Sequence, residues 1–152
     1  MQAYLPEKIG RPEMFSGRKK ELELFQRWID GIPKGISKSR ALLSRRKTGK
    51  TAIMQRLYNL TFAKPDGVIP FYYEIKEGKV WAVDFCADFA LTFLYQYIAF
   101  KTRKSNYIDP PSKQRGAFDA AKEIVRQEGL EYLLDDIEGI EHCVLEGHVD
   151  RL

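Results

Sequence analysis

The chain has 152 residues, of which 44% are hydrophobic and 30% are charged; this is typical of one globular domain and excludes an intrinsically disordered chain. The net charge of +4 favours partners that carry phosphate groups, without distinguishing a nucleotide from a nucleic acid. Two cysteines exclude a disulfide framework. The N-terminus lacks the apolar core of a secretory signal, and the most apolar stretch, residues 89–100, is shorter than the roughly 20 residues that span a bilayer. We therefore expect a soluble cytoplasmic protein with no membrane segment.

The first predicted helix begins at Ser16, which has the side chain of a helix N-cap, and ends at Gly31. Leu22, Phe25 and Ile29 recur within it at helical spacing. Further along, the apolar pattern predicts a short buried strand at residues 41–43, a helix at 51–62, a strand at 68–75, a long buried helix at 80–103 and a helix at 116–134.

Strands and helices that alternate in this way predict an α/β fold, a parallel sheet flanked by helices as in P-loop NTPases. Only two strands are convincing, and a stable parallel sheet usually has more. We therefore expect an incomplete sheet, truncated before its Walker B strand or completed by a partner. The predicted organisation is a single domain over residues 1–152, with an N-terminal extension at 1–14, a P-loop unit at 15–62, and the second strand and helical region at 63–152.

A basic loop separates the first predicted strand from the helix that follows it. Residues 44–51 match the Walker A frame G-x-x-x-x-G-K-[ST] at three of its four fixed positions, with Ser44 in place of the first glycine. In such a loop, successive backbone N–H groups face phosphate oxygens at the positive end of a helix dipole. Lys50 is expected to reach the β- and γ-phosphates, and the Thr51 hydroxyl to bind Mg²⁺. The alternative is a basic turn that binds nothing.

The predicted cofactors are therefore ATP, or a related nucleotide, and Mg²⁺. The predicted binding residues of the loop are Ser44, Arg45, Arg46, Lys47, Thr48, Gly49, Lys50, Thr51 and Ala52.

Phe15, Gly17, Arg18, Glu21 and Leu22 form a box ahead of this loop. Box and loop together resemble the prokaryotic and archaeal AAA-type ATPase family, which is related to the signal-transduction ATPases, over about residues 10–105. The resemblance implies that Gly17 and Arg18 lie beside the adenine base. It also implies an ATPase whose Walker B strand lies beyond residue 152, so that this chain would be the N-terminal part of the domain.

The candidate for a Walker B strand within the chain is residues 132–136, which end in Asp135 and Asp136. Its apolar residues continue the spacing of the preceding helix, so we interpret it as a helix C-terminus with solvated carboxylates. The sequence thus predicts nucleotide binding and does not assign hydrolysis.

Two other functions remain open on the sequence. One is a nucleotide-dependent interaction module without hydrolysis, acting through a protein partner or self-association. The other is a nucleic-acid binder, which is less favoured because the phosphate loop itself accounts for much of the basic cluster. The group His142, Cys143, Glu146 and His148 lacks the paired spacing of a zinc site and is interpreted as a polar tail.

Overall fold

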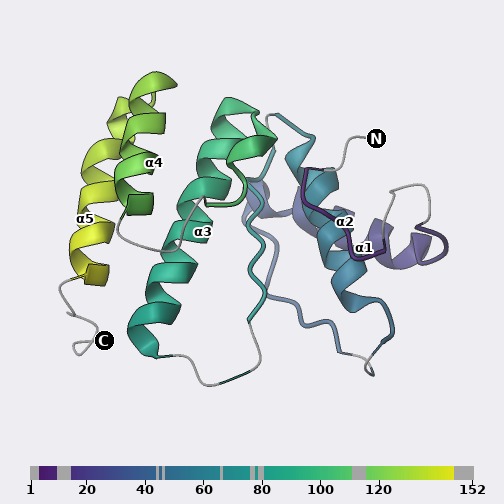
Figure 1. The fold of residues 1–152 in the computed structure, drawn as a ribbon. Helices are drawn as coiled ribbons and strands as arrows, with labels where there is room; N and C mark the ends of the chain where they lie inside the picture. The colour runs from purple at the N-terminus through teal and green to yellow at the C-terminus, as the bar shows by residue number, and fades with distance from the viewer. Residues whose placement is uncertain are drawn as a thin grey trace. The chain divides into compact units, whose positions relative to one another are not determined.

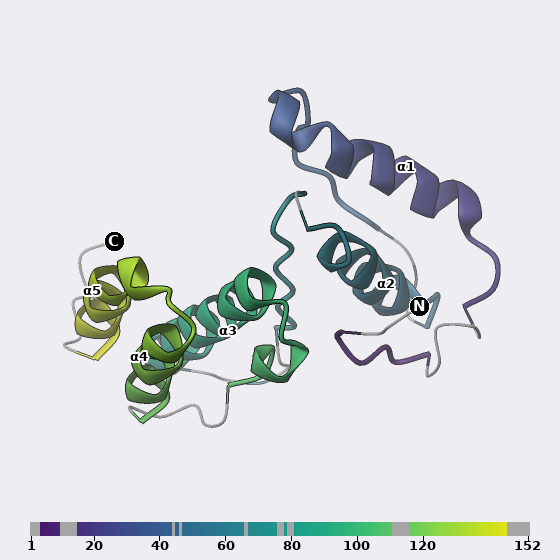
Figure 2. The ribbon, with the colours of Figure 1, turned by 90° about the horizontal axis from the view of Figure 1, so that it is seen from above.

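The computed structural model describes residues 4–9, 15–43, 45, 47–65, 67–75, 78, 81–110 and 116–145. Within these ranges the regular structure is helical, and the chain divides into two compact units, Met1–Tyr72 and Tyr73–Leu152. Figures 1 and 2 show the helices of each unit from two directions.

The first unit contains helix α1, Lys19–Asp30, a short 3-10 helix, Ile32–Lys34, and helix α2, Lys50–Phe62. Phe25 and Ile29 lie one turn apart on α1 and are buried against Ile53 and Leu57 of α2. These four side chains are the apolar core that joins the two helices. The helix predicted at residues 51–62 is confirmed to within one residue, as is the end of the first helix at Gly31.

The prediction of Ser16 as the N-cap of α1 is wrong. The N-cap is Arg18, which has a left-handed backbone with φ 52° and makes no side-chain capping bond. Gly17 before it is also left-handed, with φ 76°. Two consecutive residues in this conformation cannot be part of a right-handed helix, so α1 begins later than the capping pattern predicts.

The predicted parallel sheet of a P-loop NTPase is contradicted, because no described residue belongs to a β-strand. Residues 41–43 and 68–75 lie outside regular structure, and Leu43, predicted to be buried, is 89% exposed. Leu42 and Val68 instead pack against the apolar core of α1 and α2. A strand needs a hydrogen-bonded neighbour, and no backbone hydrogen bond joins residues 41–43 to residues 68–69. Apolar, β-branched composition was therefore insufficient to predict a strand here.

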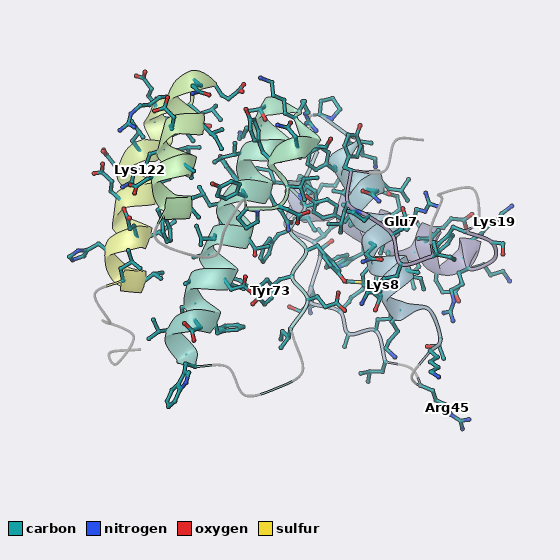
Figure 3. All side chains as sticks on the ribbon, in the orientation of Figure 1. Glu7, Lys8, Lys19, Arg45, Tyr73 and Lys122 are labelled. Carbon is teal, nitrogen blue, oxygen red and sulfur yellow. The ribbon has the colours of Figure 1, made fainter. Side chains whose placement is uncertain are left out.

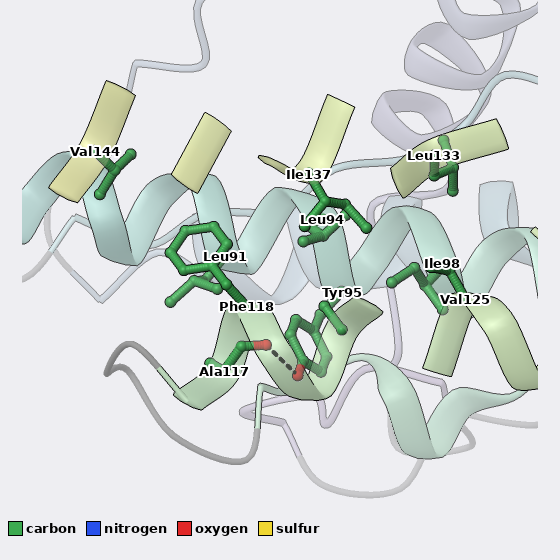
Figure 4. Close-up of a cluster of buried hydrophobic side chains, with 11 residues drawn as sticks. Leu91, Leu94, Tyr95, Ile98, Ala117, Phe118, Val125, Leu133, Ile137 and Val144 are labelled. Carbon is green, nitrogen blue, oxygen red and sulfur yellow. Dashed lines mark hydrogen bonds between the residues drawn. The ribbon is translucent and has the colours of Figure 1, made fainter. Parts of the chain in front are cut away.

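The second unit is built from helices α3, Ala82–Thr102, α4, Gly116–Gln127, and α5, Leu134–Leu145, with 3-10 turns at Ser105–Tyr107 and Glu131–Leu133. Its core forms where α4 and α5 pack on α3 and on each other. Figure 4 shows this cluster, in which the Tyr95 hydroxyl donates a hydrogen bond of 2.9 Å to the Ala117 carbonyl. The long helix predicted at 80–103 is thus confirmed as a helix, but the prediction that it is largely buried is wrong for its first half, where Val83, Phe85 and Phe89 are exposed.

The single helix predicted at residues 116–134 is wrong, because two helices occupy this region. Gly129 has φ 68° and ends α4. Its N–H bonds to the Arg126 carbonyl and that of Leu130 to the Val125 carbonyl, the pattern of a Schellman motif. Leu133 and Leu134 therefore belong to the next 3-10 turn and to α5, which continues to Leu145 through residues that the sequence suggested were a polar tail.

Among the described residues, α3 is long and apolar enough to cross a membrane by length and composition, which are tests that the core helix of a soluble protein also passes. Its 21 residues exceed the 12-residue stretch on which the sequence argument rested.

Candidate functional site

The phosphate loop borders a cavity of about 480 Å³ in the first unit. Residues 47–52 line it, together with Lys8 and Ile9 from the N-terminal part of the chain. The structure therefore brings together six of the predicted loop residues, including Lys50 and Thr51. It also adds two residues of the extension at 1–14, for which no role was predicted.

The backbone of the loop places its amides at the start of α2. Gly49 is the N-cap of the helix with φ 80°, a conformation that favours glycine. An added Cβ at Gly49 would meet nothing within 4 Å, so backbone conformation rather than space requires glycine in this structure. The first bond of the helix runs from the Ile53 N–H to the Gly49 carbonyl over 3.1 Å. The amides of Thr51 and Ala52 precede this bond and lie at the positive end of the helix dipole.

The Arg45 carbonyl organises the loop from within. It accepts hydrogen bonds from the Thr48 hydroxyl at 2.8 Å and from the Lys50 ammonium at 2.9 Å. The Lys50 side chain is thereby folded over its own loop, next to the cavity. The Arg45 side chain is exposed and points away from the ribbon in Figure 3, and it does not line the cavity.

Arg18, which was predicted from the resemblance to lie beside adenine, contacts the loop directly. Its guanidinium donates a hydrogen bond of 2.5 Å to the Thr48 carbonyl and lies 3.6 Å from the Glu21 carboxylate. The two bonded residues are 30 positions apart in the sequence, so the box and the loop are joined in space. Neither Gly17 nor Arg18 lines the cavity. The left-handed backbone of Gly17 forms the turn that precedes Arg18.

Three lysines, Lys8, Lys47 and Lys50, line the same cavity, and none of the residues that line it carries a carboxylate. Thr51, the predicted Mg²⁺ ligand, lines the cavity too. Such a cationic lining suits a polyanion. Ser44 and Arg46, the remaining predicted residues of the loop, lie outside the described residues.

The sequence did not indicate Lys8 and Ile9, because they belong to no motif. The one available signal was on α2, where Gln55 and Asn59 interrupt a largely apolar helix four residues apart. Both are buried, and both bond to the N-terminal part of the chain. Buried polar side chains require hydrogen-bond partners, and the partners of these two are distant in sequence.

The candidate Walker B segment at residues 132–136 is helical, which excludes the strand reading. It begins a helix instead of ending one, since Asp135 and Asp136 occupy the first turn of α5 with exposed side chains. His142 and Cys143 are exposed on the same helix, whereas Glu146 and His148 lie outside the described residues. Across the described part of the chain, no group of three or more His, Cys, Asp or Glu side chains could hold a metal ion.

Comparison with known proteins found no match to the chain among protein-family models, curated proteins or solved structures.

Proposed function

We propose that this chain binds ATP with Mg²⁺ through the loop at residues 44–51. The observation that carries the proposal is the cavity at the start of α2, where the helix amides and the lysines of the loop border one space. Backbone N–H groups at a helix N-terminus bind phosphate oxygens, and a lysine ammonium adds a charge for the terminal phosphates. A polyphosphate would compete with the Arg45 carbonyl for the Lys50 ammonium.

The metal fits the same arrangement. Mg²⁺ at such loops is held by one or two protein oxygens together with phosphate oxygens, and needs no cluster of carboxylates. The Thr51 hydroxyl makes no hydrogen bond within the described part of the chain. It is therefore available as the protein ligand, one residue beyond Lys50.

The proposal extends to binding and stops before hydrolysis. Hydrolysis needs a group that orients the attacking water, and the residues lining the cavity offer no carboxylate for this. A cavity lined by lysines and by no carboxylate is consistent with a module that binds a nucleotide and is recognised by a partner in its bound state.

Calorimetric titration with MgATP tests the proposal. Lys50→Ala should weaken binding at least about tenfold, because a charge-assisted hydrogen bond to phosphate is lost. Lys20→Ala is the matched control, since Lys20 is an exposed lysine on α1 and its loss removes the same charge away from the loop. Equal affinity in the wild type and the Lys50→Ala variant would disprove the assignment of the phosphate site.

Thr51→Ala separates the metal from the phosphates. This variant should lose most of the affinity difference between MgATP and ATP in excess EDTA, while metal-free ATP binds as before. An unchanged difference would remove Thr51 from the metal site without affecting the role of Lys50.

A further inference from the structure

Amide side chains of α2 hold the N-terminal segment, residues 4–9, against that helix. Asn59 has no exposed surface. Its side-chain oxygen accepts the backbone N–H groups of Tyr4 at 3.0 Å and Leu5 at 2.7 Å. Its side-chain nitrogen donates to the Leu5 carbonyl and the Glu7 carboxylate, each at 2.9 Å. One buried side chain thus uses its full hydrogen-bonding capacity to place the segment.

Two further contacts extend this attachment toward the phosphate loop. The Lys8 N–H donates to the Gln55 side-chain oxygen at 2.8 Å. The Glu7 carboxylate lies 3.4 Å from the Arg56 guanidinium, with both side chains buried. Figure 3 labels Glu7 and Lys8, which come from the segment beside α2. Beyond these contacts, Lys8 and Ile9 reach the cavity of the phosphate loop.

The attachment and the phosphate site share one face of α2. Thr51, Gln55 and Asn59 are four residues apart in succession, and such positions lie on the same side of a helix. The helix therefore carries the predicted metal ligand at its first turn and the two holding amides at its second and third turns. The position of Lys8 is consequently tied to the helix whose N-terminus faces the cavity.

We propose that the N-terminal segment is part of the nucleotide site, with Lys8 as a phosphate-binding residue and with Gln55 and Asn59 as positioning residues. This inference rests on the proposed function, because it names a further contact at the same cavity. Lys8, Lys47 and Lys50 line one cavity, and a cavity lined by several lysines favours a polyanion such as the triphosphate of ATP. The segment is held through the backbone amides of Tyr4, Leu5 and Lys8, the Leu5 carbonyl and the Glu7 carboxylate, so the bond between Gln55 and Lys8 uses the backbone of Lys8.

Hydrogen exchange of the full chain without nucleotide tests the attachment. The amides of Tyr4, Leu5 and Lys8 should exchange slowly in the wild type. Gln55→Ala should accelerate exchange at Lys8, and Asn59→Ala at Tyr4 and Leu5. Gln26→Ala is the control, because this glutamine bonds to Asp30 on the surface of α1. If these amides exchange as fast in the wild type as in the Gln55→Ala and Asn59→Ala variants, the attachment is overturned.

Titration with MgATP and with adenosine tests the role of Lys8. Lys8→Ala should weaken MgATP binding about tenfold, as expected for one lost ion contact to phosphate. It should leave adenosine binding unchanged. Lys8→Arg should restore most of the affinity, because the charge is kept while the shape changes. Gln55→Ala should weaken MgATP binding less than Lys8→Ala, and Lys20→Ala should have no effect.

The outcomes distinguish this inference from the proposed function. If Lys50→Ala abolishes MgATP binding while Lys8→Ala binds as the wild type does, the role of Lys8 is overturned and the phosphate loop stands. If Lys8→Ala weakens adenosine and MgATP equally, Lys8 is not a phosphate ligand. If the wild type does not bind MgATP, both proposals are overturned.

Discussion

In the second unit, the side chains buried between α3, α4 and α5 are almost all apolar, whereas the first unit buries charged and amide groups beside a smaller apolar core. The buried polar residues of the first unit are Glu7, Gln55, Arg56, Asn59 and Thr61, against Gln96 in the second, within the part of the chain that the structure describes. The apolar core of the second unit needs only helices that pack together. The first unit also needs a specific hydrogen-bonding partner for each polar group, and it finds most of these partners in residues 4–9.

This difference has consequences for stability. Apolar packing is non-directional, so the second unit should respond to lost volume. A buried polar network is directional, so the first unit should respond to the loss of a single charge or amide. Three predictions test the contrast, from the largest effect to the smallest.

Phe118→Ala should destabilise the second unit by about 3–5 kcal/mol, because a fully buried aromatic ring is replaced by a cavity. Phe118 is 1% exposed and lies in the α3–α4–α5 core. Urea unfolding followed by circular dichroism measures the loss. Val83→Ala, at a half-exposed position on α3, should change stability by less than about 0.5 kcal/mol. Similar losses in the two variants would contradict the packing of this core.

Glu7→Gln should destabilise the first unit by about 3 kcal/mol, because it leaves the buried Arg56 guanidinium without its carboxylate. The two tryptophans fall one in each unit. In a Trp81→Phe background, the fluorescence of Trp28 therefore reports on unfolding of the first unit alone.

The double variant Glu7→Gln, Arg56→Met should regain part of this stability, because neither charge is then buried alone. If the losses of the two single variants simply add, Glu7 and Arg56 are not coupled and the contrast between the units weakens.

The smallest effect is a dependence on pH in the second unit. The Glu128 carboxylate accepts bonds from the Lys104 ammonium at 2.6 and 2.8 Å and from the Tyr107 hydroxyl at 2.8 Å. The bonds from Lys104 and then Tyr107 hold the pKa of Glu128 below its ordinary value of 4.5. A carboxylate whose pKa is lower in the folded state than in the unfolded chain stabilises the fold at pH values above its unfolded pKa. The contribution of Glu128 should therefore be present above about pH 4.5 and be lost as the pH falls below that value.

Comparison with Glu128→Gln isolates this contribution. The difference in unfolding free energy between the wild type and Glu128→Gln should shrink between about pH 6 and pH 3. A constant difference over that range would show that the group at Glu128 does not stabilise the folded state through its charge.

Part of the fold was predictable because it depends on local pattern. The long helix α3 and the helix α2 follow from apolar spacing, and Gly31 ends α1 as glycine does at many helix ends. Gly129 is also a helix-ending glycine, and it separates α4 from α5, which the apolar spacing alone predicts as one helix. The prediction of a strand at residues 68–75 is wrong for another reason. The β-branched and aromatic residues of this segment favour a strand, but a strand exists only where another strand is present to pair with it.

The candidate site likewise has one part that local sequence predicts and another part that it does not. By itself, the sequence determined that Gly49, Lys50 and Thr51 stand at the start of a helix with lysines around them, because glycine punctuation, charge and apolar period are all local properties. Only the tertiary structure decided that the Arg18 guanidinium bonds to the Thr48 carbonyl and that Lys8 lines the cavity. Those contacts join residues 30 and more positions apart through hydrogen bonds, and no spacing along the chain specifies which buried amide will meet which backbone group.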